Sequence, residues 1–169
     1  MRGFFLMIWM SVVGATILSG QSNFFIDQEN GNSLTVCNGT LFDSGGSSQD
    51  YGPNENFVVT FCPPSGDQVT RLSIYDFGMG RGDQICLYDG ASISAPQLNC
   101  VDDFYGILPF VYQASNENAT GCLTLSFTSD GILEAAGFEI NIDCAFRCQQ
   151  MDLQLLSTTP VADIPLDGV

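Results

Sequence analysis

Residues 122–128 read Cys-Leu-Thr-Leu-Ser-Phe-Thr, a stretch in which apolar and polar residues alternate. Leu123, Leu125 and Phe127 share one face if the stretch is a strand, because successive side chains in a strand point to opposite faces. A strand of this kind keeps one face in a core and the other toward solvent. The stretch therefore predicts a half-buried strand in an antiparallel sheet.

Five other segments also predict short strands, because they are rich in β-branched and aromatic residues: 56–62, 69–76, 85–88, 107–112 and 138–144. Pro109 lies inside the fourth segment and predicts an edge strand or a bulge, since proline has no N–H for a strand ladder. Glycine, proline and asparagine separate the segments, and no long stretch after the N-terminal region shows a capped helical period. The pattern predicts an all-β, antiparallel sandwich.

The composition excludes several classes of function. The chain has 169 residues, of which 19 are acidic and four basic, with a net charge of −15 and no histidine. A chain this acidic is not drawn to nucleic acid or to an anionic membrane surface. Without histidine it contains no Ser-His-Asp triad, Cys-His dyad or histidine zinc helix, so we predict that it is not an enzyme. The acidic surface favours a cationic partner, or serves only to keep the protein soluble.

The N-terminus is typical of a secretory signal peptide, which we place at residues 1–22. Met1 and Arg2 give a short positive start, residues 4–18 form an apolar run, and residues 19–22 are small and polar. The run is shorter than the roughly 20 residues that a membrane span needs. We therefore predict a secreted or cell-surface protein with no stable span after signal cleavage. An uncleaved anchor is the alternative.

The cysteines predict a disulfide framework rather than a metal site, because a secreted chain folds in an oxidising compartment. There are seven: Cys37, Cys62, Cys86, Cys100, Cys122, Cys144 and Cys148. Zinc is disfavoured because the last two have no matching second pair and no histidine. Seven is an odd number, so at least one cysteine has no partner within this chain, and the residues alone leave many pairings open.

Three motifs, in order, resemble a CUB domain. Residues 37–40 (Cys-Asn-Gly-Thr) and 51–54 (Tyr-Gly-Pro-Asn) resemble the opening of that family. Residues 83–90 (Asp-Gln-Ile-Cys-Leu-Tyr-Asp-Gly) resemble its central signature. Residues 123–130 (Leu-Thr-Leu-Ser-Phe-Thr-Ser-Asp), followed by Gly-Phe at 137–138, resemble its ending. With Asp-Ser-Gly-Gly at 43–46 and Gly-Cys-Leu-Thr at 121–124, the chain is similar to the version found in large secreted proteins of Bacteroidetes.

This resemblance implies a two-sheet antiparallel, jelly-roll-like sandwich over residues 37–144. Residues 23–36 would be a lead-in. Residues 145–169 resemble a linker or the start of a following PKD-like domain. We therefore expect the chain to be the N-terminal part of a longer protein, with Cys148 pairing beyond its end. A short tail with a free or intermolecular thiol is the alternative.

The resemblance also implies a disulfide pairing. Cys37 with Cys62 would staple the loop at 43–54 to the sheet, and the other two bridges would join Cys86 to Cys100 and Cys122 to Cys144. The last bridge conflicts with simple alternation, which puts Cys122 on the polar face of its strand and Cys144 on the core face. A strand would have to twist or end there.

A calcium ion is the cofactor that the family implies. Asp83 and Asp130 match two of its ligands, but the expected glutamate is missing, because its place falls around residues 79–80 (Met-Gly). Calcium takes six to eight oxygens, usually with more than one carboxylate. Asp76 is the first candidate substitute, followed by Asp50, Glu55 or carbonyls near Gly131. The alternative is that Asp83 and Asp130 are turn residues that bind local backbone amides.

Together these features predict an extracellular binding or adhesion module that contacts a protein or a glycan, with calcium as a candidate aid. It would be one part of a larger secreted or surface protein. The alternative from another class is an accessory, non-catalytic domain of a secreted hydrolase, a protease or glycosidase whose catalytic domain lies outside this chain. A third possibility is a structural spacer without a ligand.

Overall fold

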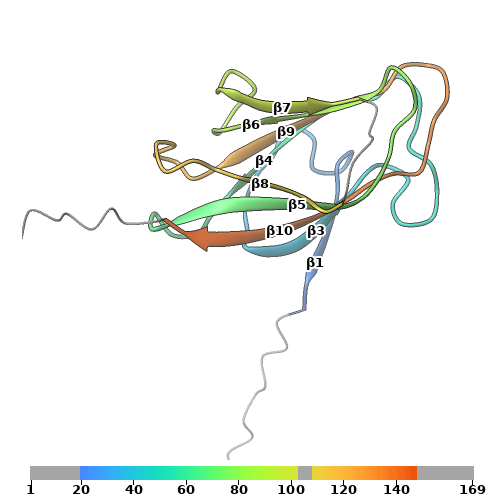
Figure 1. The fold of residues 1–169 in the computed structure, drawn as a ribbon. Helices are drawn as coiled ribbons and strands as arrows, with labels where there is room; N and C mark the ends of the chain where they lie inside the picture. Colours follow the sequence, from blue (N-terminus) through green and yellow to red (C-terminus); the bar gives the residue numbers. More distant parts are fainter. Residues whose placement is uncertain (1–19, 103–107, 148–169) are drawn as a thin grey trace, which may run out of the picture.

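Two sheets packed face to face make up the fold in the computed structural model, which describes residues 20–102 and 108–147 (Figure 1). Within these residues the chain forms ten strands and no helix, so none of them forms an apolar helix that could cross a membrane. The predicted all-β, two-sheet sandwich is confirmed.

Each sheet has five strands. In spatial order, the first contains β1 (Ser22–Phe25), β3 (Asn38–Phe42), β10 (Gly137–Phe146), β5 (Gln68–Gly78) and β8 (Phe110–Gln113). The second contains β2 (Ser33–Thr35), β4 (Asn56–Cys62), β9 (Leu123–Thr128), β6 (Gln84–Tyr88) and β7 (Gln97–Val101). All pairs are antiparallel except β1 with β3 and β2 with β4, which are parallel at the sheet edges.

The core lies between the sheets and follows the predicted alternation. Leu123, Leu125 and Phe127 of β9 are fully buried, and they face Ile140 and Ile142 of β10 across the core cluster. Fully burying one side chain of this size stabilises the fold by about 1.5–3 kcal/mol. The alternation is incomplete on β9, because Thr124 is also buried, where its hydroxyl donates to the Gly90 carbonyl at 2.8 Å.

The six predicted strand segments correspond to β4, β5, β6, β8, β9 and β10, with small shifts at their ends. β8 is an edge strand, as Pro109 predicted, and it begins at the next residue. Four strands were not predicted: β1, β2, β3 and β7. Of these, β1 and β2 lie within residues 20–36 and hydrogen-bond to the two sheets. The proposed domain limits stay predictions. Residues 1–19 of the predicted signal peptide at 1–22, and residues 148–169 of the predicted tail, including Cys148, lie outside the described residues.

Six cysteines form three disulfides, and the pairing differs from the family-based prediction. The structure joins Cys37 to Cys144, Cys62 to Cys122 and Cys86 to Cys100. The predicted bridge between Cys86 and Cys100 is therefore confirmed. The predicted bridges from Cys37 to Cys62 and from Cys122 to Cys144 are wrong.

Strand register explains the observed pairing. Cys86 and Cys100 are direct partners between β6 and β7. Asn38 of β3 faces Asp143 of β10, so Cys37 and Cys144 come next along the same ladder, with Cα atoms 5.1 Å apart. Phe61 faces Leu123 in the second sheet, which brings Cys62 to Cys122 with Cα atoms 4.1 Å apart. Cys37 precedes β3 of the first sheet and Cys62 ends β4 of the second, so each lies opposite a different cysteine along its own antiparallel ladder.

The loop at 43–55 is anchored by Asp43 instead of by a disulfide staple. Asp43 is fully buried, and its Oδ1 accepts hydrogen bonds from the backbone amides of Gly45 at 2.7 Å and Gly46 at 3.1 Å. Its Oδ2 accepts from the amide of Phe138 in β10 at 2.8 Å. Burial raises the pKa of Asp43, although these amides oppose the shift. The loop therefore starts from a fixed point on the first sheet.

Tryptic digestion of the denatured, unreduced protein tests the disulfide pairing. Cleavage after arginine leaves one fragment that ends at Arg71 and contains Cys37 and Cys62, and a second fragment, 82–147, with four more cysteines. The observed pairing joins these fragments through two disulfides, so we expect one joined species in mass spectrometry until reductant is added. Separate fragments before reduction would contradict the structure and support the family-based pairing.

Candidate functional site

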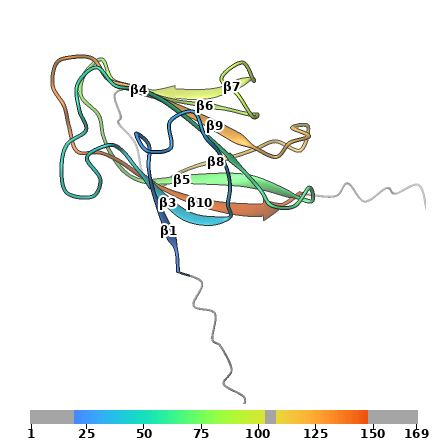
Figure 2. The ribbon, with the colours of Figure 1, turned by 180° about the vertical axis from the view of Figure 1, so that it is seen from behind.

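Three loops meet at one end of the sandwich, and we call this region the loop end: residues 43–55, 79–83 and 129–136 (Figures 1 and 2). Backbone hydrogen bonds tie them together. The amide of Tyr51 donates to the carbonyl of Ala135 at 3.3 Å, and the amide of Asn54 donates to the carbonyl of Asp130 at 2.7 Å. The loop end is therefore one connected surface.

A buried polar network lies beneath this surface. Asp83 is only 1% exposed, and its Oδ2 accepts a hydrogen bond from the Tyr51 hydroxyl. Its Oδ1 accepts from the backbone amide of Asp130 at 2.7 Å. The Tyr51 hydroxyl in turn accepts from the amide of Gly80 at 2.7 Å. One carboxylate and one phenol thus connect all three loops, which explains why a charged residue is tolerated inside the fold.

Tyr51 acts as a neutral donor in this network. Burial, and then the hydrogen bond to Asp83, raise the pKa of Tyr51 well above its usual range. The Tyr51 ring also packs edge-on against Phe127, with ring centroids 5.1 Å apart. The side chain is therefore fixed by the core at its ring and by the loops at its hydroxyl.

Asp130 lies at the surface directly above Asp83. It is exposed, and its Oδ1 accepts from the amide of Ile132 at 2.7 Å. Gly82 has a φ of 100°, and a Cβ atom there would lie 2.7 Å from Asp130 Oδ2. Only glycine suits both this backbone conformation and this close approach. The structure thus brings the two predicted aspartates together. Asp130 binds the local amide of Ile132, as the turn-residue alternative proposed, whereas Asp83 binds the amide of Asp130, which is 47 residues away.

The remaining acidic candidates do not join this pair. Asp76 lies on β5, and with Asp50 it lines a hollow beside the loop at 43–55. Glu55 turns inward, where its Oε1 accepts from the Ser44 hydroxyl at 2.6 Å. A Cβ atom on Gly80, near the place of the missing glutamate, would lie 2.7 Å from Asp83 Oδ2. Within the described residues, no group of three or more His, Cys, Asp or Glu is arranged to hold a metal ion.

Sequence reasoning missed two features of the loop end. Tyr51 was interpreted only as part of a turn, yet it is the centre of the buried network. Ile132 and Leu133 are 67% and 63% exposed, and Leu133 has a φ of 65°, an uncommon conformation for a bulky residue. The only signal in the sequence was two adjacent apolar residues in a loop.

Comparison with known proteins finds no protein-family model and no curated protein that matches this chain. Among solved structures, the chain is similar to the MASP-1 CUB2 domain bound to Ca2+, with 18% identity and a TM-score of 0.50 over 68% of this chain and 98% of that one. It is also similar to the CUB1-EGF-CUB2 domain of human MASP-1/3, with 15% identity and a TM-score of 0.50 over 69% of this chain and 42% of that one.

A third similar structure is the full extracellular region of zebrafish Gpr126/Adgrg6, with 18% identity and a TM-score of 0.47 over 68% of this chain and 14% of that one. This chain therefore spans less than half the length of two of the three structures. The two MASP structures show that the fold is CUB-like. The narrower resemblance to proteins of Bacteroidetes stays a prediction.

The Tyr51→Phe substitution tests the buried network through its dependence on pH. At pH 8 we expect it to cost about 1–3 kcal/mol, because Asp83 and the Gly80 amide lose a partner. Above a pH of about 10 the unfolded chain loses the Tyr51 proton while the folded chain keeps it. The free energy of unfolding of the wild type therefore falls by about 1.4 kcal/mol per pH unit relative to that of the variant. The gap between the wild type and the variant should therefore shrink as pH rises.

Urea unfolding between pH 8 and pH 11 measures this gap. Tyr75→Phe is the matched control, because it removes the hydroxyl of a tyrosine that is 55% exposed. A gap of constant size for Tyr51→Phe across this range would contradict the proposed role of its hydroxyl.

Proposed function

We propose that this chain is an extracellular, non-catalytic binding module that contacts a partner protein through its loop end. The observation that carries the proposal is the pair of exposed apolar side chains, Ile132 and Leu133, at the tip of the loop at 129–136. Exposed apolar groups rimmed by polar residues mark interaction sites. The three disulfides suit an oxidising, extracellular location.

The buried network gives this tip the rigidity that a binding surface needs. Asp130 holds the amide of Ile132, and its own amide is held by the fully engaged carboxylate of Asp83. Leu133 keeps its left-handed backbone next to Gly80, whose missing side chain leaves room for the Leu133 carbonyl. Backbone conformations of this kind persist where surrounding structure fixes them, and they cluster at functional sites. A fixed apolar tip loses little entropy on binding.

Calcium belongs to this proposal as a weak ligand of the same surface. Asp83 and Asp130 would supply the carboxylates, and the glycines at positions 80 and 82 place no side chain of their own against them. The third carboxylate that the family uses is absent, and both Asp83 oxygens already accept hydrogen bonds. Because affinity follows the number of charged ligands, we assign a dissociation constant of about 1 mM, typical of extracellular modules. Calcium would add a cross-link between the loops.

Thermal melting with calcium and with chelator tests this part of the proposal. At about 5 mM calcium, a 1 mM site adds roughly 1 kcal/mol of stability, which raises the midpoint by about 3–6 °C in a domain of this size. The Asp130→Asn variant should lose the rise, because its amide oxygen can keep the bond to Ile132 but its charge is gone. The matched control is Asp67→Asn, an exposed carboxylate in the loop between β4 and β5. An equal rise in Asp130→Asn and Asp67→Asn would contradict the assignment.

Photo-crosslinking tests the binding surface itself. Benzoylphenylalanine is placed at Ile132 in the full chain, which is then incubated with extracellular fluid and intact cells of its source. The matched control carries the same group at Phe146, which is 71% exposed and is the last residue of β10, whose arrow ends away from the loop end (Figure 1). We expect a protein adduct at Ile132 but not at Phe146. Equal labelling at both positions, or adducts of glycan mass only, would contradict a protein-binding loop end.

A further inference from the structure

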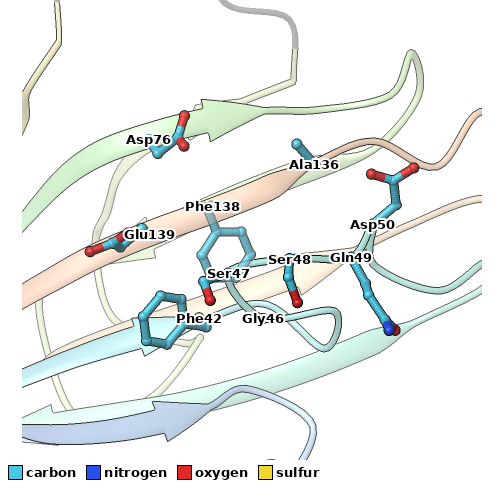
Figure 3. Close-up of a pocket in the computed structure, with 10 residues that line it drawn as sticks. All are labelled: Phe42, Gly46, Ser47, Ser48, Gln49, Asp50, Asp76, Ala136, Phe138 and Glu139. Carbon is cyan, nitrogen blue, oxygen red and sulfur yellow. The ribbon is translucent and has the colours of Figure 1, made fainter.

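A second surface lies beside the loop end. The loop at 43–55 and the strands β3, β5 and β10 enclose a hollow of about 280 Å³ (Figure 3). Phe42 and Phe138 form its aromatic part, and the latter is only 2% exposed. The exposed carboxylates of Asp50, Asp76 and Glu139 stand around it. Figure 3 shows that these three come from different segments: the loop, β5 and β10.

A β-bulge places two of these carboxylates opposite each other. Ile140 of β10 faces Ile74 of β5, but the register then shifts, so that Glu139 faces Asp76. Without the shift, Glu139 would face Tyr75. Like charges directly opposite each other on neighbouring strands destabilise a sheet. Bulges re-aim side chains and are common next to functional sites. The fold thus contains an unfavourable pair that an ordinary antiparallel register would have avoided.

The three arginines of the described residues are Arg71, Arg81 and Arg147, and none of them forms an ion pair with the carboxylates at the hollow. Arg71 forms its ion pair with Asp143 at 2.6 Å. Arg147 donates to backbone carbonyls at the opposite end of the sandwich, including that of Gly66 at 3.0 Å. Asp50, Asp76 and Glu139 form no ion pair within residues 20–102 and 108–147. The three carboxylates therefore suit a cation that comes from another molecule.

We propose that this hollow binds an arginine side chain of a partner protein. Its volume of about 280 Å³ leaves room for a single long side chain. A guanidinium group can lie against an aromatic ring such as Phe42 while it donates two parallel hydrogen bonds to a carboxylate. The net charge of −15 favours approach of a basic partner. The inference rests on the proposed binding function but uses a surface separate from Ile132 and Leu133.

Peptide titration followed by NMR tests the inference on the ¹⁵N-labelled full chain at low salt. The probe is a blocked Gly-Gly-Arg-Gly-Gly peptide, and its neutral counterpart carries citrulline in place of arginine. We expect the arginine peptide to shift the amides around Phe42, Ser47 and Glu139, and the citrulline peptide to leave them unchanged. A lysine peptide should bind more weakly, because it lacks the planar donor pair.

The affinity for the arginine peptide is then compared between two double variants, each of which removes two negative charges. Asp76→Asn with Glu139→Gln should weaken arginine binding about tenfold or more, since hydrogen bonds to charged groups contribute about 1.5–3 kcal/mol. Asp67→Asn with Glu117→Gln alters two exposed carboxylates outside the lining of the hollow and should leave the affinity within about twofold, because the interaction of two charges through water falls with distance.

Several results would overturn the inference: no binding of the arginine peptide, equal binding of the citrulline or lysine peptide, equal losses in the two double variants, or shifts confined to residues 79–83 and 129–133. None of these results changes the outcome expected from crosslinking at Ile132. A failed titration with retained crosslinking would therefore exclude the hollow and keep the apolar tip at Ile132 and Leu133 as the binding surface.

Discussion

The loop end depends on one buried interaction, the hydrogen bond from the Tyr51 hydroxyl to the carboxylate of Asp83. An ionised group inside a fold is stable only when its oxygens are satisfied, and here the phenol and the amide of Asp130 do this together. Because the phenol also accepts from Gly80, the three loops are held by one shared pair of side chains. Loss of the phenol would leave one oxygen of the buried Asp83 carboxylate without its partner. It would also remove a contact that all three loops share.

The loop at 43–55 connects the two proposed surfaces. Its start is fixed by Asp43 on the amide of Phe138, and its far end is fixed by Tyr51 on Asp83. Between these anchors the chain turns outward, and Asp50 lines the hollow at the end away from Glu139 (Figure 3). Two inward anchors make an outward-facing segment rigid without any disulfide in the loop. A partner could thus contact the apolar tip and the acidic hollow as neighbouring parts of one surface.

Much of the fold was predictable, because it follows from residue periodicity. Leu123, Leu125 and Phe127 alternate on β9 and are buried as predicted. The four strands that were not predicted are short. One of them, β3, begins with Asn-Gly-Thr, a sequence that is typical of a turn. The disulfide pairing could not be predicted from the residues, because the partner of Cys37 depends on which strand lies beside β3. Asp83 and Asp130 were found through a resemblance, whereas Tyr51 was missed because no local pattern shows that its hydroxyl meets a carboxylate 32 residues away.

Two pairs of acidic residues around the loop end and the hollow differ in what their oxygens contact. Asp43 and Asp83 are buried, and backbone amides and one phenol satisfy them, so their role is to hold loops. Asp50 and Glu139 are exposed and line the hollow, where their charge contributes nothing to the internal hydrogen bonding described above. Repulsion among such exposed charges lowers stability slightly, and solubility alone does not require the register shift that sets Glu139 opposite Asp76. The register shift therefore favours a binding role for these carboxylates over a role in solubility alone.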